Sequence, residues 1–180
     1  MLRAPVGSRT RPTSDRVREA MFSILTSMDA VEGARVLDLF AGSGALGIEA
    51  LSRGAEAVTF VDSDGAALDA IRVNLAVVGH DAARATVVRA DVMRWIDTSS
   101  PVDLVLADPP YAFDRWAELL RLLEGRTQLI VAETASPWDP GPGWETVKQK
   151  RYGGTVVSVA HGLPVVPSAV RCQVNQEGDS

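Results

Sequence analysis

The sequence has 180 residues, of which 46% are hydrophobic and 23% are charged, and its formal net charge is -5 at pH 7. This composition is typical of one soluble globular domain, and no stretch has the roughly 18 consecutive apolar residues that a membrane helix needs. The chain holds one cysteine, Cys172, and two histidines, His80 and His161, which excludes an internal disulfide and the usual zinc sites. We therefore expect a cytoplasmic protein that binds neither metal nor membrane.

Positive charge is concentrated in two segments of the chain. Residues 1–18 have a local net charge of +4, so the rest of the chain carries -9, and the basic residues of this leader are Arg3, Arg9, Arg11, Arg16 and Arg18. A basic leader on an acidic body favours attraction to an anionic partner and binding of a cationic ligand by the body. The alternative is a solvated leader without a partner. A smaller basic group comprises Lys148, Lys150 and Arg151.

Hydrophobic patterning predicts helices and strands in alternation. A helix capped by Thr13 or Ser14 should run to about Ser27. Further helices are predicted from a glycine-rich turn over 41–47 through residue 51, over 65–78 and over 114–124, with a short helix or turn over 91–96. Strands are predicted over 35–40, 57–61, 85–89, 102–107, 128–132, 146–150 and 155–160.

Strands that are apolar on both faces and alternate with helices are typical of a parallel sheet covered by helices. The predicted fold is therefore α/β, open and doubly wound, with its last two strands forming an antiparallel pair at the carboxyl-terminal edge. We expect a basic leader over residues 1–13, one domain over residues 14–162, and a flexible tail over residues 163–180, where the pattern disappears.

A glycine-rich turn is the strongest local signal in the sequence. Gly42, Gly44 and Gly47 form a G-x-G-x-x-G pattern directly after a predicted strand, and Asp62 ends the next strand, 20 residues beyond Gly42. The glycines let the backbone approach a ligand, and a carboxylate at this distance can accept the hydroxyls of a ribose. The pattern predicts a nucleoside cofactor. A plain turn between strand and helix is the alternative.

Asp38 indicates which nucleoside this turn would bind. A dinucleotide places an anionic pyrophosphate against the start of such a helix, where the carboxylate of Asp38 would repel it. S-adenosylmethionine instead carries an ammonium and a sulfonium, which a carboxylate attracts. A phosphate loop is excluded because Ile48 and Glu49 stand where Lys and Ser/Thr are required. The charge of Asp38 thus favours S-adenosylmethionine.

Asp91 follows the strand predicted over residues 85–89 and has two compatible roles. It could accept the amino group of an adenine at the carboxyl edge of the sheet, where ligands bind in open α/β folds. It could also cap the short helix that follows.

The segment Asp108-Pro109-Pro110-Tyr111 follows the fourth predicted strand, at the same sheet edge. A planar exocyclic amine is a poor nucleophile, but the Asp108 carboxylate and the Pro109 carbonyl could accept its two hydrogens and direct its lone pair towards a methyl donor. The prolines would fix these acceptors, and Tyr111 offers a ring on which a base can stack. A proline-braced loop without catalytic function is the alternative.

Four segments together resemble one known family. They are residues 11–22 (RPTSDRVREAMF), 36–47 (VLDLFAGSGALG), 49–55 (EALSRGA) and 108–111 (DPPY). In this order they are similar to the bacterial small-subunit rRNA guanine-N2 methyltransferases called RsmD, over roughly residues 9–160. The glycine turn and the DPPY loop occur in many amino-methyltransferases, whereas the first segment, residues 11–22, favours this family in particular.

The resemblance implies a seven-stranded class I methyltransferase fold and S-adenosylmethionine as methyl donor. The acceptor would be one guanine amine, at the position conventionally numbered 966, in 16S rRNA within the 30S subunit or an assembly intermediate. The implied cofactor-binding residues are Thr13, Arg16, Asp38, Phe40, Ala41, Gly42, Gly44, Gly47, Asp62 and Asp91. The implied catalytic residues are Asp108, Pro109, Pro110 and Tyr111. The implied RNA-binding residues are Arg9, Arg11 and Arg18.

The family also begins with a basic β-hairpin ahead of the Arg-Pro-Thr segment, which is not evident between Met1 and Arg11. Either the sequence is truncated at its start, or RNA binding is weaker in this chain. We expect the protein to be monomeric. Other activities stay open: methylation of DNA adenine or of a protein amide, nicotinamide-dependent oxidoreduction, and RNA binding without catalysis. A DNA enzyme would need a sequence-reading segment, for which 180 residues leave little room. Asp38 argues against a nicotinamide, and an intact DPPY loop argues against a non-catalytic module.

Overall fold

The computed structural model describes residues 15–79 and 82–164. Its elements in chain order are α1 (Asp15–Ser27), β1 (Arg35–Leu39), α2 (Ala45–Ser52), β2 (Ala57–Asp62), α3 (Gly65–Val78), β3 (Ala85–Arg89), α4 (Val92–Trp95), β4 (Leu104–Ala107), α5 (Trp116–Leu123), β5 (Leu129–Thr134), β6 (Trp144–Tyr152) and β7 (Thr155–Gly162). Single 3-10 turns, Ala82–Arg84 and Ile96–Thr98, precede β3 and follow α4. The predicted leader lies outside the described residues, as does the predicted tail beyond residue 164.

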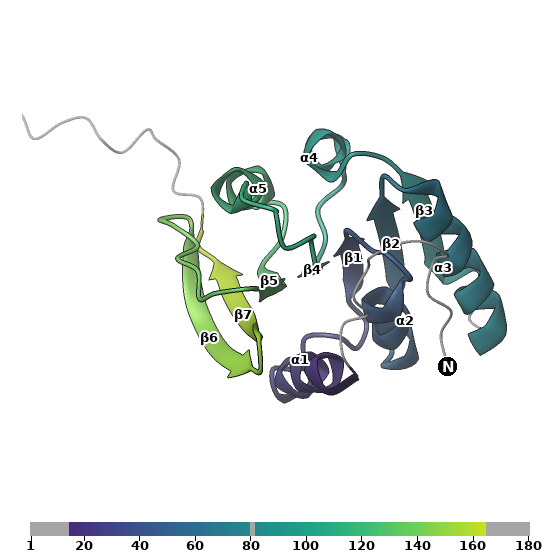
Figure 1. Cartoon of the computed structure of the whole chain (residues 1–180), viewed down its shortest axis with the longest axis horizontal. Helices are drawn as coiled ribbons and strands as arrows, with labels where there is room; N and C mark the ends of the chain where they lie inside the picture. The colour runs from purple at the N-terminus through teal and green to yellow at the C-terminus, as the bar shows by residue number, and fades with distance from the viewer. Residues whose placement is uncertain (1–14, 80–81, 165–180) are drawn as a thin grey trace, which may run out of the picture.

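The strands of this part of the chain form one seven-stranded sheet in the order β3-β2-β1-β4-β5-β7-β6. Strands β1 to β5 are parallel to one another, while β7 is antiparallel to both β5 and β6. Figure 1 shows the sheet running from β3 at one side of the molecule to β6 at the other. The predicted α/β fold, doubly wound and mostly parallel with an antiparallel carboxyl-terminal pair, is confirmed.

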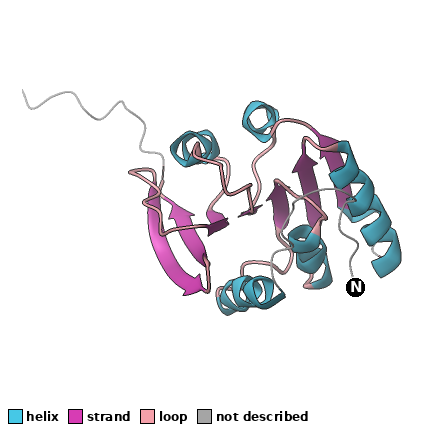
Figure 2. Ribbon diagram, viewed as in Figure 1, coloured by secondary structure: helices cyan, strands magenta, loops and turns pink. Residues whose placement is uncertain are grey.

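Helices cover both faces of the sheet. Figures 1 and 2 show α1, α2 and α3 on one face and α4 and α5 on the other. Each face has its own cluster of buried apolar side chains, and the strands contribute alternate residues to the two clusters. In β1, for example, Val36 packs towards α1 and α2 whereas Leu37 packs towards α4 and α5. This two-sided burial explains why the strands read as continuous apolar runs.

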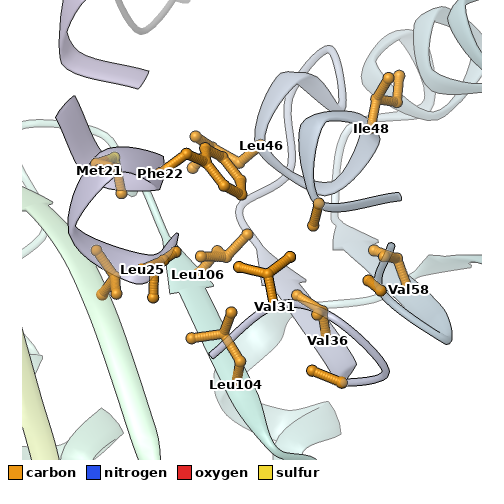
Figure 3. Close-up of a cluster of buried hydrophobic side chains, with 14 of the residues drawn as sticks. Met21, Phe22, Leu25, Val31, Val36, Leu46, Ile48, Val58, Leu104 and Leu106 are labelled. Carbon is orange, nitrogen blue, oxygen red and sulfur yellow. The ribbon is translucent and has the colours of Figure 1, made fainter. Parts of the chain in front are cut away.

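The larger cluster fixes the helices that precede and follow β1. Figure 3 shows the side chains of α1, α2, β1, β2 and β4 meeting in this cluster, among them Met21, Phe22, Leu25, Val36, Leu46, Val58, Leu104 and Leu106. In α1 the buried residues recur every three or four positions, which places them on one stripe of the helix. The start of α2 is therefore held in place from both sides.

Helix boundaries follow from local hydrogen bonds. Asp64 caps α3 by accepting a hydrogen bond from the backbone N–H of Ala66 at 3.0 Å, and the helix ends at Gly79, whose φ of 69° is left-handed. The predicted range of this helix is confirmed. Other boundaries differ by two residues: β4 begins at Leu104 instead of Val102, and β5 continues to Thr134 instead of ending at residue 132. In the same way α5 begins at residue 116 instead of 114, β6 spans 144–152 instead of 146–150, and β7 ends at residue 162 instead of 160. The longer β5 extends into the region of the candidate site.

Across residues 15–79 and 82–164, no helix is both long enough and apolar enough to cross a membrane.

Candidate functional site

The strand order changes direction between β1 and β4, and the chain leaves both strands at the same edge of the sheet. Ligands of open α/β folds bind at this position, because the loops that follow the two strands diverge and leave a crevice. One carboxylate belongs to each of four adjacent strands near this edge: Asp62 ends β2, Asp38 lies in β1, Asp108 follows β4 and Glu133 lies in β5. Asp62, Asp108 and Glu133 each lie two residues beyond the position in register with Asp38. Three of the carboxylates therefore lie at one level of the sheet edge, and Asp38 lies deeper.

The glycine turn between β1 and α2 adopts a left-handed backbone. Phe40, Gly42 and Gly44 have φ values of 58°, 54° and 76°, which are unstrained for glycine but cost on the order of 1 kcal/mol for phenylalanine. The turn is held by two hydrogen bonds, from Ala41 N–H to the Val61 carbonyl at 3.1 Å and from Gly44 N–H to the Ala41 carbonyl at 2.7 Å. The sequence therefore places its glycines where the backbone needs them.

Gly47 serves a different purpose from the other two glycines, because it lies inside helix α2. A Cβ atom at this position would overlap the ring of Phe60 and lie 2.8 Å from Cγ1 of Val58. The absence of a side chain thus lets α2 pack closely on β2, which brings the amino end of the helix to the sheet edge.

Asp38 is buried directly beneath this turn, with 1% of its surface exposed. Its Oδ2 accepts a hydrogen bond from the backbone N–H of Gly47 at 2.8 Å. Burial raises the pKa of Asp38 well above its ordinary value; the hydrogen bond from Gly47 opposes this effect, and repulsion by Asp108 and Asp62 adds to it. A positive charge bound nearby would stabilise the ionised form. Asp38 therefore favours a cationic ligand in the crevice.

Asp62 braces the glycine turn from the neighbouring strand. Its Oδ2 accepts a hydrogen bond from Gly42 N–H at 2.8 Å and its Oδ1 accepts one from Asp64 N–H at 2.9 Å. The residue is only half-buried. An ionised carboxylate has about four acceptor positions, so Asp62 can accept further hydrogen bonds from a ligand while it holds the turn.

Asp91 follows β3 and caps α4, because its Oδ1 accepts a hydrogen bond from the backbone N–H of Arg94 at 3.1 Å. The capping role considered for this residue is confirmed. Its contact with an adenine stays a prediction.

The DPPY loop forms one wall of a pocket of about 180 Å³. The loop turns back on itself, since Phe113 N–H donates to the Pro110 carbonyl at 2.8 Å. Tyr111, in this loop, is 55% exposed. The residues that line the pocket are Asp108, Pro109, Pro110, Tyr111, Phe113, Trp116, Glu133, Thr134, Ala135, Ser136 and Trp138.

A row of aromatic rings connects the glycine turn with this pocket. The ring of Phe40 lies 5.0 Å from that of Phe113, Phe113 lies 5.2 Å from Trp116, and Trp116 lies 4.8 Å from Trp138. The contacts are tilted or edge-on, which is a favourable geometry for aromatic pairs. Sequence analysis did not single out the last three rings as site residues. Their only signal is a concentration of aromatic residues after the DPPY segment, which is also typical of a core helix.

The cations near the site differ in their partners. Arg16 is exposed in the first turn of α1, whereas Arg18 is paired with Asp15 at 2.8 Å and lies 3.8 Å from Glu49. Thr13, Arg9 and Arg11 lie outside the described residues. Arg18 therefore has its charge largely offset on the protein itself, and its contact with RNA stays a prediction.

The second basic group lies on strand β6. Lys148, Lys150 and Arg151 are exposed and form no ion pair with any residue that the structure describes. Through β7, Lys150 is in register with Glu133 and Arg151 with Thr134. The backbone of Lys150 and Arg151 thus lies about two strand spacings, roughly 10 Å, from that of two pocket residues.

Among the described residues, no group of three or more His, Cys, Asp or Glu side chains is arranged to hold a metal ion. The carboxylates at the sheet edge come from separate strands, and two of them are occupied by backbone N–H donors. The chemistry that this site offers on its own is hydrogen-bond acceptance and attraction of positive charge.

Comparisons with known proteins agree with this geometry. The family model described as conserved hypothetical protein 95 matches residues 1–161. The chain is 39% identical over 141 residues to the putative rRNA methyltransferase YlbH of Bacillus subtilis, covering 73% of this chain and 75% of that protein. It is 34% identical over 168 residues to ribosomal RNA small subunit methyltransferase D of Escherichia coli K12, covering 93% of this chain and 74% of that protein.

Solved structures share the fold. The putative methyltransferase yhhF from Escherichia coli superposes with a TM-score of 0.74 at 34% identity, covering 84% of this chain and 87% of that chain. A putative RNA methyltransferase from Pyrococcus horikoshii also reaches a TM-score of 0.74, covering 90% of this chain and 91% of that chain. At 20% identity the second likeness concerns the fold alone.

Proposed function

The chain belongs to the conserved hypothetical protein 95 family and is a methyltransferase of the RsmD type, and from this premise we propose that it methylates the exocyclic N2 amine of one guanine in 16S rRNA. The target would be the position conventionally numbered 966, in the 30S subunit or an assembly intermediate. S-adenosylmethionine would be the methyl donor. The observation that carries the proposal is the placement of two carboxylates at one edge of the sheet: Asp38 is buried beneath the glycine turn, where it favours a cation, and Asp108 lines the pocket of the DPPY loop, where it can accept from an amine.

The residues of the glycine turn fit S-adenosylmethionine. Asp38 is a buried carboxylate whose pKa is raised, so a cation in the crevice offsets an unfavourable charge. Asp62 retains acceptor capacity for ribose hydroxyls, and the left-handed backbone at Gly42 and Gly44 leaves no side chain between the turn and a ligand. When bound, S-adenosylmethionine supplies an electrophilic methyl group on a positively charged sulfur.

The DPPY loop would prepare the acceptor. The Asp108 carboxylate and the Pro109 carbonyl accept the two hydrogens of the guanine amine, which localises the nitrogen lone pair and aims it across the crevice. Tyr111 offers its exposed ring for stacking of the base. No strong base is required before attack, because the amine becomes acidic once it has taken the methyl group, and Asp108 or water then accepts the proton. A base inside a helix would have to be looped out to reach this loop.

Basic residues at both ends of the domain support an RNA partner. Lys148, Lys150 and Arg151 form no ion pair with the acidic residues of the described ranges, and the leader adds Arg9 and Arg11. Phosphate contacts by such residues position a nucleic acid without reading its sequence. The relative from Escherichia coli K12 is named as a small-subunit rRNA methyltransferase, which is why we assign the RNA to this subunit.

The proposal is tested by offering the purified protein and S-adenosylmethionine with a labelled methyl group to 16S rRNA, 30S particles, duplex DNA and a peptide pool. Nuclease digestion and mass spectrometry should then identify N2-methylguanosine at a single position of the rRNA. Label found in N6-methyladenosine of DNA or in a protein amide would show that the acceptor is not the rRNA guanine. Absence of transfer to all four acceptors, with S-adenosylmethionine bound, would contradict the activity.

A further inference from the structure

Two carboxylates lie side by side at the pocket. Strands β4 and β5 are paired up to Ala107 and Ala132, so Asp108 and Glu133 occupy the next position along the two chains. Both residues line the same pocket. Since Asp108 alone would suffice to accept a hydrogen from an amine, the second carboxylate requires a role of its own.

Glu133 is held in a defined orientation. Its Oε1 accepts a hydrogen bond from Thr155 Oγ1 at 3.1 Å, and Thr155 is buried in the adjacent strand β7. The backbone beyond Glu133 is fixed as well, because the hydroxyl of Thr134 donates to the Ser136 carbonyl at 2.7 Å. Glu133 is thus a half-buried acceptor on a rigid strand, which is the kind of support that a specific recognition residue needs.

A hydrogen-bond acceptor at the position of Glu133 can distinguish guanine from adenine. In guanine, the N2 amine is adjacent to an N1–H donor, whereas the ring nitrogen beside the adenine amine is an acceptor. An ionised carboxylate accepts hydrogen bonds and donates none. Beside an amine held by Asp108, Glu133 would therefore accept the N1–H of guanine and repel the ring nitrogen of adenine.

We infer that Glu133 is the residue that selects guanine as the methyl acceptor, by accepting its N1–H. This assignment rests on the proposed function, since it concerns the acceptor base of the same reaction. A hydrogen bond of this kind discriminates between bases by roughly 10- to 100-fold. Glu133 would contact the base directly, whereas the residues of the glycine turn would bind the methyl donor.

The test compares two RNAs that differ at one base. After the target position has been mapped, 16S rRNA is ligated with either guanine or 2-aminopurine at that position. 2-Aminopurine keeps the amine at carbon 2, but its N1 has no hydrogen and its carbon 6 carries no oxygen. The part of the preference that depends on Glu133 is therefore read from the variant. The wild-type enzyme should prefer guanine by roughly 10- to 100-fold in kcat/KM. The variant E133Q, whose side-chain amide can both donate and accept, should lose most of this preference by slowing on guanine RNA.

Two controls separate recognition from structure. The variant T155V removes the hydrogen bond that orients Glu133 but leaves the carboxylate, and it should keep a preference for guanine. Calorimetry should show that E133Q binds S-adenosylmethionine as the wild type does, which also reports that the variant is folded. If Glu133 were only a structural partner of Thr155, both variants would lower the rates on the two RNAs by the same factor.

The possible results point to different conclusions. A preference for guanine that is unchanged in E133Q, or an equal loss on both RNAs, overturns the assignment of Glu133 while the methyltransferase activity stands. A wild-type enzyme that labels neither RNA overturns the proposed function, and the assignment fails with it. Loss of the preference in E133Q, with donor binding unchanged, supports both.

Discussion

The carboxylate of Asp38 and the backbone N–H of Gly47 are joined by a hydrogen bond of 2.8 Å in a region from which solvent is almost excluded. The bond fastens the first turn of α2 to the middle of β1, so the position of the glycine turn depends on a charged group in an apolar environment. Burying a carboxylate is costly unless the charge is compensated. The turn is therefore stable in two ways: with Asp38 protonated, or with Asp38 ionised beside a cation.

The stability of the free protein should depend on the protonation of Asp38. Its pKa is raised in the folded state, mainly by burial, so the folded protein holds this proton more tightly than the unfolded chain. The stabilisation is fully present below the unfolded pKa of about 3.9 and is lost as the pH rises through the raised pKa. We expect D38N, which can still accept the hydrogen bond from Gly47, to lack this decline. Urea unfolding across a pH series measures it, and parallel curves for the wild type and D38N would refute it.

Binding of S-adenosylmethionine should show the opposite dependence on pH. A cationic ligand binds the ionised form of Asp38, so its affinity should rise as the pH rises through the raised pKa. D38N should abolish this rise and weaken binding by about 10-fold or more, as expected for loss of a charge-assisted contact. Titration calorimetry reports the affinity. D69N, at an exposed carboxylate paired with Arg72, is the control that should bind like the wild type.

The substitution G47A should destabilise the protein through overpacking. Its added methyl group would overlap the Phe60 ring, and such insertions cost about 1–3 kcal/mol. The matched control is G154A, at a position where a Cβ meets no atom within 4 Å and φ is not left-handed. The free energy of unfolding in urea should fall for the first variant only. Equal stability of the two variants would mean that α2 can move away from β2 without cost.

Removal of the Asp108 side chain should stop methyl transfer without affecting donor binding. D108A lacks the acceptor for the guanine amine, and loss of such a group lowers kcat by about 100-fold or more. The nearby exposed residue Asp114 supplies the control D114A, which should retain full turnover. Single-turnover rates and calorimetry separate chemistry from binding. A D108A enzyme that keeps most of its turnover would exclude the proposed role.

Neutralising the basic group on β6 should reduce the salt dependence of RNA binding. Each contact with a phosphate of single-stranded RNA contributes about 0.7 to the slope of log affinity against log salt, so the triple variant K148Q/K150Q/R151Q should lose about 2 from this slope. R72Q, whose charge is partnered by Asp69 at 2.9 Å, serves as control. The affinities are measured from low to high salt. A slope equal to that of the wild type would show that β6 does not contact phosphate.

Sequence patterns predicted the fold well because most of its features are local. The glycines of the turn, the helix over residues 65–78 and the apolar strands each depend on neighbouring residues, and the structure places them as predicted. The pocket was only half predicted. Asp108 to Tyr111 form a compact motif, whereas Glu133 joins them through the pairing of β4 with β5, which sequence periodicity does not specify.

The end of β5 illustrates the limit of such reasoning. The apolar run stops at Ala132, so the strand was predicted to end there, but its ladder with β7 continues to Thr134. Hydrogen bonds to a neighbouring strand, and not hydrophobicity, decide where this strand ends. A carboxylate that directly follows a buried strand at the ligand edge of the sheet was the available signal for Glu133. The same signal identified Asp62 and Asp108.

Strand β6 has one further consequence, which concerns contact between molecules. It is one of the two edge strands of the sheet, and along its outer side it pairs with no strand of the part of the chain that the structure describes. Lys148 and Lys150 follow a register shift that interrupts the regular ladder with β7. Charged side chains and bulges on outer strands hinder the growth of intermolecular sheets. We therefore expect the lysines proposed to attract RNA also to hinder the pairing of β6 with a strand of another molecule.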